Sequence, residues 1–287
     1  EDDPTGPNAV RLIDEYELAV RLSYFLWSTM PDKELTSLAD RGELRKPGVL
    51  QAQVNRMLRD PKASALSENF AGQWLQLRTL KTVTPDKGYF PTWDDSLRKA
   101  MIREAELFFE NIVREDRSVL EFVNADYTFL NERLATHYGI KGVTGSDFRK
   151  VQLPDGTRGG VITMGSTLTV TSAPTRTSPV KRGKWILENL LGTTPPAPPA
   201  NVPPLETKPG AAPRTIRERM AAHRAPGCVN CHQLIDPLGF ALEGFDGIGA
   251  WRTHDAGAPV DASSKLADGR AINGVAELRA ALTARPE

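Results

Sequence analysis

Both cysteines of the 287-residue chain lie beside one of its four histidines, in the stretch CVNCH from Cys228 to His232. Residues of these types at this spacing are suited to three kinds of chemistry. A Cys-x-x-Cys-His sequence attaches haem covalently, a Cys-x-x-Cys pair forms a redox-active dithiol, and sulfur and nitrogen donors bind zinc. The three alternatives predict different proteins, so the surrounding sequence has to discriminate between them.

The spacing of this motif favours covalent haem. The thiols of Cys228 and Cys231 would each bond one vinyl group of the porphyrin, and His232 would become an axial iron ligand. A redox dithiol usually sits in a thioredoxin-like βαβ pattern, which the flanking sequence lacks. Zinc requires four ligands, and the adjacency of Cys231 and His232 makes a shared tetrahedral site awkward. The other imidazole donors are His137, His223 and His254. We therefore expect one covalent haem c per chain.

The ligand on the other side of the iron decides which function such a haem performs. A Met or His there favours electron transfer, whereas an open position permits peroxide or oxygen chemistry. Met164, flanked by glycines in GGVITMGSTLTV, is the first candidate metal ligand after His232, and its alternative role is to fill the core. His223 could ligate the iron or bond a haem propionate. The distal position thus stays open between Met164, His223 and no ligand.

Basic side chains near the motif are candidates to neutralise the haem propionates. Arg176 and Arg182 lie in the block TRTSPVKRG, and Lys181 and Arg224 are further candidates. Charge-assisted hydrogen bonds to carboxylates suit this task. The alternative for each is an ordinary solvated basic surface.

The first 140 residues carry apolar residues at helical spacing, as in DEYELAVRLSYFLWS, where Asp14 is placed to cap a helix. The pattern extends to shorter helices over 117–123 and 127–138. Such stripes are typical of core packing, and this half shows no catalytic constellation. The sequence therefore predicts a helical bundle here.

The pattern changes after Gly139. Two β-prone runs around Asp155-Gly156 predict a hairpin, and residues 178–192 predict a helix with Ser178 as cap and Pro179 at its first position. Residues 193–213 contain eight prolines, which predicts an extended connector. A basic amphipathic helix over 214–225 then leads to the haem motif.

Composition narrows the class of protein. The chain has 36 basic and 36 acidic residues, so its balanced charge argues against a broad nucleic-acid-binding surface. It has no apolar run of the roughly 20 residues that span a bilayer. The first ten residues do not resemble a signal peptide, and the end lacks a helix stop, so we expect a mature form or a piece of a longer protein.

Several long blocks resemble a known family. CVNCHQLIDPLGFALEGFDGIGAWR and the upstream TLTVTSAPTRTSPVKRGKWILENLLG resemble the C-terminal cytochrome c module of planctomycete-type multidomain proteins, domain of unknown function 1588. The helical half resembles domain 1592, and residues 259–282 resemble the start of domain 1585. The resemblance implies a periplasmic or secreted protein whose redox partner is another protein or a second haem domain.

Together these observations predict a mainly α protein. Residues 1–140 would form the helical domain, and residues 141–255 a cytochrome c-like module with a small β element and the connector 193–213. Residues 256–287 would begin a truncated C-terminal domain. The expected function is one-electron transfer by the haem. The alternative is a peroxidase- or oxygenase-like enzyme with an open or weakly ligated distal iron position.

Overall fold

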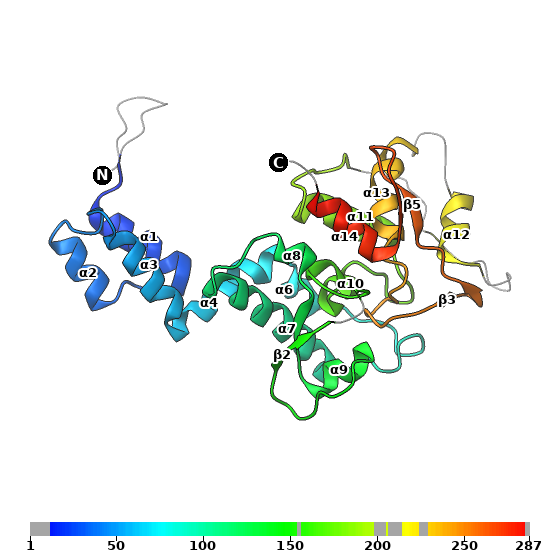
Figure 1. The fold of residues 1–287 in the computed structure, drawn as a ribbon, viewed down its shortest axis with the longest axis horizontal. Coiled ribbons are helices and arrows are strands. Elements are labelled where there is room, and N and C mark those ends of the chain that lie inside the picture. The colour runs from blue at the N-terminus through cyan, green and yellow to red at the C-terminus, as the bar shows by residue number, and fades with distance from the viewer. Residues whose placement is uncertain (1–11, 154–155, 198–204, 206–213, 224–228, 285–287) are drawn as a thin grey trace. The chain divides into compact units, whose positions relative to one another are not determined.

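The computed structural model describes residues 12–153, 156–197, 205, 214–223 and 229–284 (Figure 1). Within these ranges the chain is mainly α, as predicted, and its strands form three two-stranded antiparallel sheets. The chain divides into two compact units. One contains the residues up to Phe70 together with Val113–Asp116, and the other contains Ala71–Ile112 and the residues from Arg117 onwards.

In the first unit, α1 packs against α2 and α3. Asp14 caps α1 as predicted, because its side chain accepts the backbone N–H of Glu17 while the Glu17 side chain accepts that of Asp14. The indole Nε1 of Trp27 donates to the Met57 carbonyl at 2.9 Å and ties α1 to α3. The elements are α1 (Glu15–Trp27), α2 (Lys33–Asp40), α3 (Val49–Arg59), the 3₁₀ turn η1 (Pro61–Ala63) and α4 (Ser64–Leu66).

The second unit contains the described part of the Cys-x-x-Cys-His motif. One of its core clusters joins residues 80–143 with Ile248, so chain segments on both sides of position 140 share one core. Its helices and turns are η2 (a π-helix, Ser67–Ala71, which begins in the first unit), α5 (Gly72–Trp74), α6 (Leu77–Leu80), α7 (Asp95–Arg114, which ends in the first unit), α8 (Glu121–Asn124), α9 (Glu132–Tyr138), η3 (Val161–Thr163), α10 (Gly165–Val170), α11 (Pro179–Asn189), α12 (Ile216–His223), α13 (Val229–Phe240) and α14 (Gly274–Thr283). Its strands are β1 (Tyr127–Leu130), β2 (Arg149–Gln152), β3 (His254–Asp255), β4 (Ala258–Pro259), β5 (Ser263–Lys265) and β6 (Ala271–Asn273).

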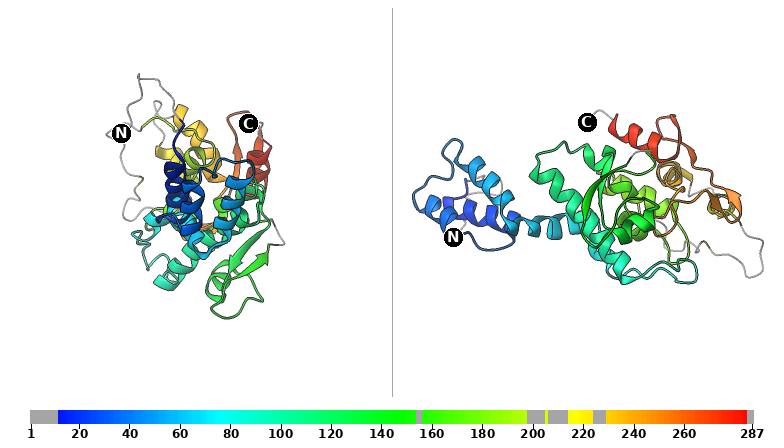
Figure 2. Two further views of the ribbon diagram at one scale, coloured as in Figure 1. Left: turned by 90° about the vertical axis from the view of Figure 1, so that its left-hand side faces the viewer. Right: turned by 60° about the horizontal axis from the view of Figure 1, so that its bottom comes forward.

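The small β element is present, but it is not the predicted hairpin. Strand β2 pairs with β1, drawn as two green arrows in the left view of Figure 2. The predicted helix over 127–138 is therefore partly wrong, since its first residues form β1 and only Glu132–Tyr138 are helical. Asn131 separates the two, because its side chain accepts the backbone N–H of Leu134 and so caps α9. Asp155 lies outside the described residues.

The second β-prone run, after Gly160, folds as η3 and α10 instead of a strand. The run is buried, and two hydroxyl groups bond back to the preceding turn: Thr169 Oγ1 donates to the Gly165 carbonyl at 2.6 Å, and Ser172 Oγ, just after the helix, donates to that of Leu168 at 2.7 Å. A bond to the carbonyl four residues earlier satisfies a hydroxyl group within helical structure. A short apolar run does not distinguish a buried strand from a buried helix.

Helix α13, which carries the end of the haem motif, is held closely against α11. Ser178 caps α11 and Pro179 begins it, as predicted. Gly183 of α11 lies against the backbone of Ile235, and Gly239 of α13 lies against that of Pro179. A side chain at either glycine would collide with backbone atoms, so the two glycines permit this approach. Most of the connector 193–213 lies outside the described residues.

The C-terminal segment belongs to the same compact unit as α13. Strand β5 contacts α13, and α14 packs on α8. The guanidinium of Arg279 on α14 donates to the carbonyls of Val123 and Ala125 at 2.9 and 2.7 Å. The division of the chain at positions 140 and 255 remains a prediction. Of the helices that the structure describes, none has the length and apolar character needed to cross a membrane.

Candidate functional site

The described part of the CVNCH motif lies in the first turn of α13. Cys231 is half-buried and its thiol is free, whereas Cys228 lies outside the described residues. His232 has a side chain that is 28% exposed, and its Nδ1 lies 2.9 Å from Oδ1 of Asp236. The imidazole is thus held on one side and accessible on another.

A pocket of about 390 Å³ opens beside His232. One of its walls comes from α13 and another from β5 with the residues that follow it. The pocket is lined by Arg217, His232, Gln233, Asp236, Pro237, Phe240, Ser264, Lys265, Leu266 and Ala267. Its volume falls within the range of roughly 300–1,000 Å³ that is typical of small-molecule sites.

The pocket suits an apolar group that carries carboxylates. Pro237, Phe240 and Leu266 provide apolar surface, and Arg217 and Lys265 provide positive charge. The guanidinium of Arg217 lies 4.0 Å from the ring centroid of Phe240 and forms a 2.9 Å ion pair with Asp261, so its position is defined. Ser264 Oγ is buried and has no hydrogen-bond partner among the described residues. A ligand that accepts a hydrogen bond would satisfy this hydroxyl. A porphyrin with two propionates fits this set of residues.

The predicted distal ligands are not seen at this pocket. Met164 is buried just before α10 and is not among the residues that line the pocket. His223 ends α12, and its side chain lies outside the described residues. Met220, on the same helix, packs in a cluster with Phe240, which lines the pocket. The roles of Met164 and His223 as ligands therefore remain predictions.

The structure gives Arg182 other partners than a propionate. Its side chain is fully buried, and Nη1 donates to the carbonyls of Leu242 and Phe245 at 2.8 and 3.0 Å. It also forms a 3.2 Å ion pair with Glu243, and burial lowers its pKa to about 10. Arg182 joins α11 to the chain that follows α13, and these contacts favour a structural role.

The other basic candidates are less tightly held. Arg176 is half-buried and donates to the carbonyl of Thr177 at 3.0 Å, while burial and the neighbouring Arg219 lower its pKa. Lys181 Nζ donates to the Ser172 carbonyl at 3.2 Å. Neither residue lines the pocket at His232, and Arg224 lies outside the described residues. Their assignment to the propionates stays a prediction.

Several residues of this site were missed in the sequence, among them Asp236, Arg217 and Lys265. Asp236 had a detectable signal, because a residue four positions after His232 lies on the same helical face. The sequence signal for Arg217 was weaker and consisted of its position in the basic helix before the motif. The sequence held no signal for Lys265, since the strand that carries it reaches the pocket only through tertiary packing.

Two other histidines have ordinary partners. His137 Nε2 lies 2.8 Å from the Ile248 carbonyl, and burial lowers the pKa of this imidazole. His254 is exposed on β3 beside the Thr253 hydroxyl. Among the described residues, no group of three His, Cys, Asp or Glu side chains is placed to hold a metal ion.

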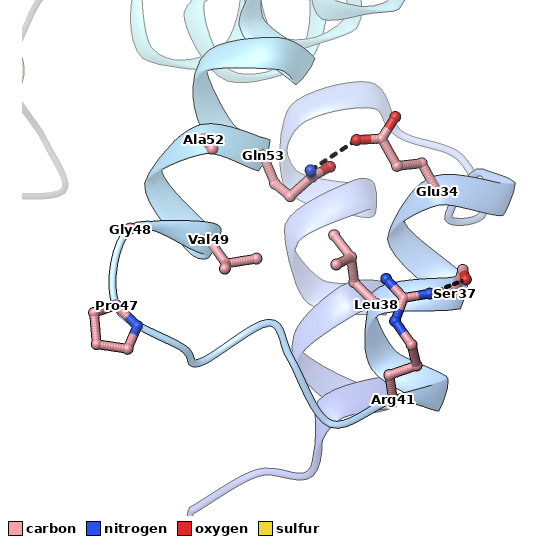
Figure 3. Close-up of a pocket in the computed structure, with 9 residues that line it drawn as sticks. All are labelled: Glu34, Ser37, Leu38, Arg41, Pro47, Gly48, Val49, Ala52 and Gln53. Carbon is pink, nitrogen blue, oxygen red and sulfur yellow. Dashed lines mark hydrogen bonds between the residues drawn. The ribbon is translucent and has the colours of Figure 1, made fainter.

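A second pocket lies in the first unit (Figure 3) and has about 430 Å³. Its polar side chains bond to one another: Gln53 Nε2 donates to Glu34 at 2.8 Å, and Arg41 Nη1 donates to Ser37 at 2.6 Å. Their hydrogen-bonding groups are thus already used within the wall. This pocket offers no chemistry comparable to that at His232.

Comparisons with known proteins match two segments of the chain. Residues 13–140 match the family described as PSD4, protein of unknown function (DUF1592). Residues 158–255 match PSCyt3, protein of unknown function (DUF1588). No curated protein and no solved structure shows significant similarity to the chain. The two matched families are planctomycete cytochrome c-type domains, which are associated with cytochrome c-like multidomain proteins.

Proposed function

We propose that the chain binds one haem c covalently and uses it for one-electron transfer to a partner protein or to a second haem. The observation that carries this proposal is the pocket beside His232, in the first turn of α13, where the described part of the Cys-x-x-Cys-His motif lies. Cys228 and Cys231 would provide the two thiols for attachment, and His232 would hold the iron through its imidazole. When bound, the haem supplies an iron that accepts and releases one electron.

The residues of the pocket each have a task in this proposal. Phe240 and Leu266 would exclude water from the cofactor, which would tune its reduction potential. Arg217 and Lys265 would pair with the propionates, and their position in the pocket lining supports this role. The residues after β5 line the site, although they lie beyond the segment that matches the cytochrome c-type family.

The proposal includes a location and a partner. Attachment of haem to a Cys-x-x-Cys-His motif places the protein in the periplasm or outside the cell, where cytochrome c-like domains typically function. The partner is a redox protein or another haem domain.

Covalent attachment is tested by expressing the chain together with a c-type cytochrome maturation system. We expect haem that survives denaturing electrophoresis and adds the mass of one haem. The double variant Cys228→Ser, Cys231→Ser should lose this signal, whereas His254→Ala, an exposed histidine outside the site, should keep it. A wild-type chain without covalent haem would refute the proposal.

Carbon monoxide separates electron transfer from the enzyme alternative. A ferrous spectrum that carbon monoxide leaves unchanged indicates two protein ligands on the iron and supports electron transfer. A high-spin iron that binds carbon monoxide and reacts with peroxide supports the peroxidase- or oxygenase-like enzyme instead. Met164→Ala and His223→Ala then test the two candidate distal ligands, because loss of that ligand changes the spectrum.

A further inference from the structure

Asp236 lies one helical turn after His232 on α13 and is directed at its imidazole. Its carboxylate is almost fully buried, with 1% of the side chain exposed, and Oδ1 lies 2.9 Å from Nδ1 of His232. The close contact between α11 and α13 fixes the backbone at this point, because Gly183 lies against Ile235, the neighbour of Asp236. The carboxylate is thus an internal part of the unit and not a mobile surface group.

The hydrogen bond determines which nitrogen of His232 carries the proton. An ionised carboxylate can only accept hydrogen bonds, so Nδ1 must be the donor. In the neutral imidazole the lone pair is then on Nε2, which becomes the nitrogen able to bind a metal. The ring is also held in one orientation, since its Nδ1–H bond is directed at a buried, immobile acceptor.

We propose that Asp236 is the positioning residue for the axial ligand: it holds Nδ1–H of His232, presents Nε2 to the iron and raises the electron-donating power of the imidazole. This inference rests on the proposed function. Carboxylates that accept the second N–H of a ligating histidine fix its tautomer and increase its basicity. A more basic axial ligand stabilises ferric over ferrous iron, so Asp236 lowers the reduction potential.

The same contact could serve only to stabilise the helix, as an ordinary pair of side chains four residues apart. The two roles differ in their consequences. Either role fixes the tautomer of His232 in the apoprotein, because both rest on the same hydrogen bond. A purely structural pair leaves the reduction potential of the haem protein unchanged when the charge of Asp236 is removed, whereas a positioning residue controls that potential.

The first test needs no haem. Nitrogen-15 NMR of the apoprotein distinguishes the two neutral tautomers of His232. We expect the Nδ1–H form in the wild type, and a mixture dominated by the Nε2–H form in Asp236→Leu, which removes the acceptor at similar volume. Asp236→Glu should restore part of the Nδ1–H form. Equal tautomer populations in the wild type and in Asp236→Leu would overturn the inference.

The second test is the reduction potential of the haem-loaded protein. Asp236→Asn, which keeps an acceptor oxygen but removes its charge, should raise the potential, and Asp236→Leu should raise it further. The control is Asp268→Asn, which removes an exposed carboxylate that pairs with Arg270 and should leave the potential close to that of the wild type. Circular dichroism tests whether each variant is folded. If Asp236→Leu does not fold, the reduction potentials of Asp236→Asn and Asp236→Glu are compared instead.

The outcomes distinguish the inference from the function on which it rests. Suppose that the wild type binds haem covalently and that the wild type, Asp236→Asn and Asp236→Glu have the same reduction potential. This result overturns the role of Asp236, but the proposal of a haem protein stands. A wild-type chain that binds no haem overturns both. A potential that rises equally in Asp236→Asn and in the control Asp268→Asn also overturns the inference, because the effect is then one of overall charge.

Discussion

The second unit buries two glutamates in opposite ways. Glu104 on α7 is 1% exposed and accepts hydrogen bonds from two hydroxyl groups, those of Thr128 at 2.7 Å and Tyr138 at 2.5 Å. Glu243, 2% exposed after α13, accepts from the guanidinium groups of Arg182 at 3.2 Å and Arg252 at 2.6 Å. Glu104 thus accepts from hydroxyl groups, whereas Glu243 accepts from two cations in addition to the Thr177 hydroxyl.

The two glutamates differ in which neighbouring groups oppose the effect of burial on their pKa values. Burial raises the pKa of Glu104 to about 7, and its hydroxyl donors only partly oppose this. Burial raises the pKa of Glu243 as well, but Arg182 and Arg252 oppose it by direct Coulombic attraction. Neutral donors can stabilise a carboxyl in either protonation state, whereas cations stabilise only the ionised one. Glu243 thus forms a buried ionic cluster with Arg182 and Arg252, which we call the ionic clamp. Glu104, with its hydroxyl donors, is a group that can bind a proton.

The largest expected effect is the loss of the clamp. Arg182→Met leaves Glu243 with one cation and removes the bonds to the Leu242 and Phe245 carbonyls, so the free energy of unfolding should fall by about 3–5 kcal/mol. Lys184→Met, an exposed position on the same helix, should change it by less than about 0.5 kcal/mol. Denaturant unfolding followed by circular dichroism measures both. A cost below about 1 kcal/mol for Arg182→Met would show that the clamp does not stabilise the fold.

The next effect is the contribution of Glu104 to the pH dependence of stability. Because the folded-state pKa of about 7 exceeds 4.5, the ordinary pKa of a glutamate side chain, the folded protein binds the proton more tightly than the unfolded chain does. The stabilisation is therefore complete below pH 4.5 and is lost as the pH rises through about 7. The wild type should lose about 2–3 kcal/mol of this contribution between pH 5 and pH 8.

Glu104→Gln isolates that contribution, because the amide does not titrate. The variant should lack this decline, and its unfolding free energy at pH 8 should match or exceed that of the wild type. The measurement is denaturant unfolding at pH 5 and pH 8 for both proteins. An exposed control, Glu218→Gln, should follow the wild type. If Glu104→Gln declines as steeply as the wild type, Glu104 is not the proton-binding group.

The smallest effect compares the two hydroxyl groups directly. Thr128→Val removes a donor from Glu104 and leaves Oε1 without that bond, at a cost of about 1–3 kcal/mol. Thr177→Val removes a 2.8 Å bond to Glu243 Oε2, which Arg252 continues to hold, so the cost should be about 0.5–1.5 kcal/mol. Both threonines are buried, so the pair is matched. Equal costs would mean that the cations at Glu243 do not compensate for the lost hydroxyl.

Local signals predicted the local structure well. Asp14 and Ser178 mark helix starts because a cap bonds to a backbone N–H only a few residues away. The strand at Tyr127–Leu130 and the helix at Gly165–Val170 were assigned wrongly, because their state depends on partners distant in the sequence. Strand β1 requires β2, and the buried position of α10 lets a β-branched run remain helical.

The residues of the candidate site also differ in how far local sequence predicts them. The spacing of Cys228, Cys231 and His232 identified them as candidate cofactor-binding residues, and Asp236 follows His232 by one helical turn. The basic residues were less predictable, because Arg182 and Lys181 are close in sequence but differ greatly in burial. Which cation faces a cofactor depends on the direction of each side chain from a packed helix.

The Cys-x-x-Cys-His motif, the mainly helical class and the helix caps could be read from the chain, since all of these depend on neighbours within a few positions. The pairing of Arg182 with Glu243, the burial of Glu104 among hydroxyl groups and the place of β5 in the wall of the pocket at His232 became visible only in the folded molecule. Burial and long-range pairing arise from packing between segments far apart in the chain. These set the pKa values and the walls of a site, which local spacing does not encode.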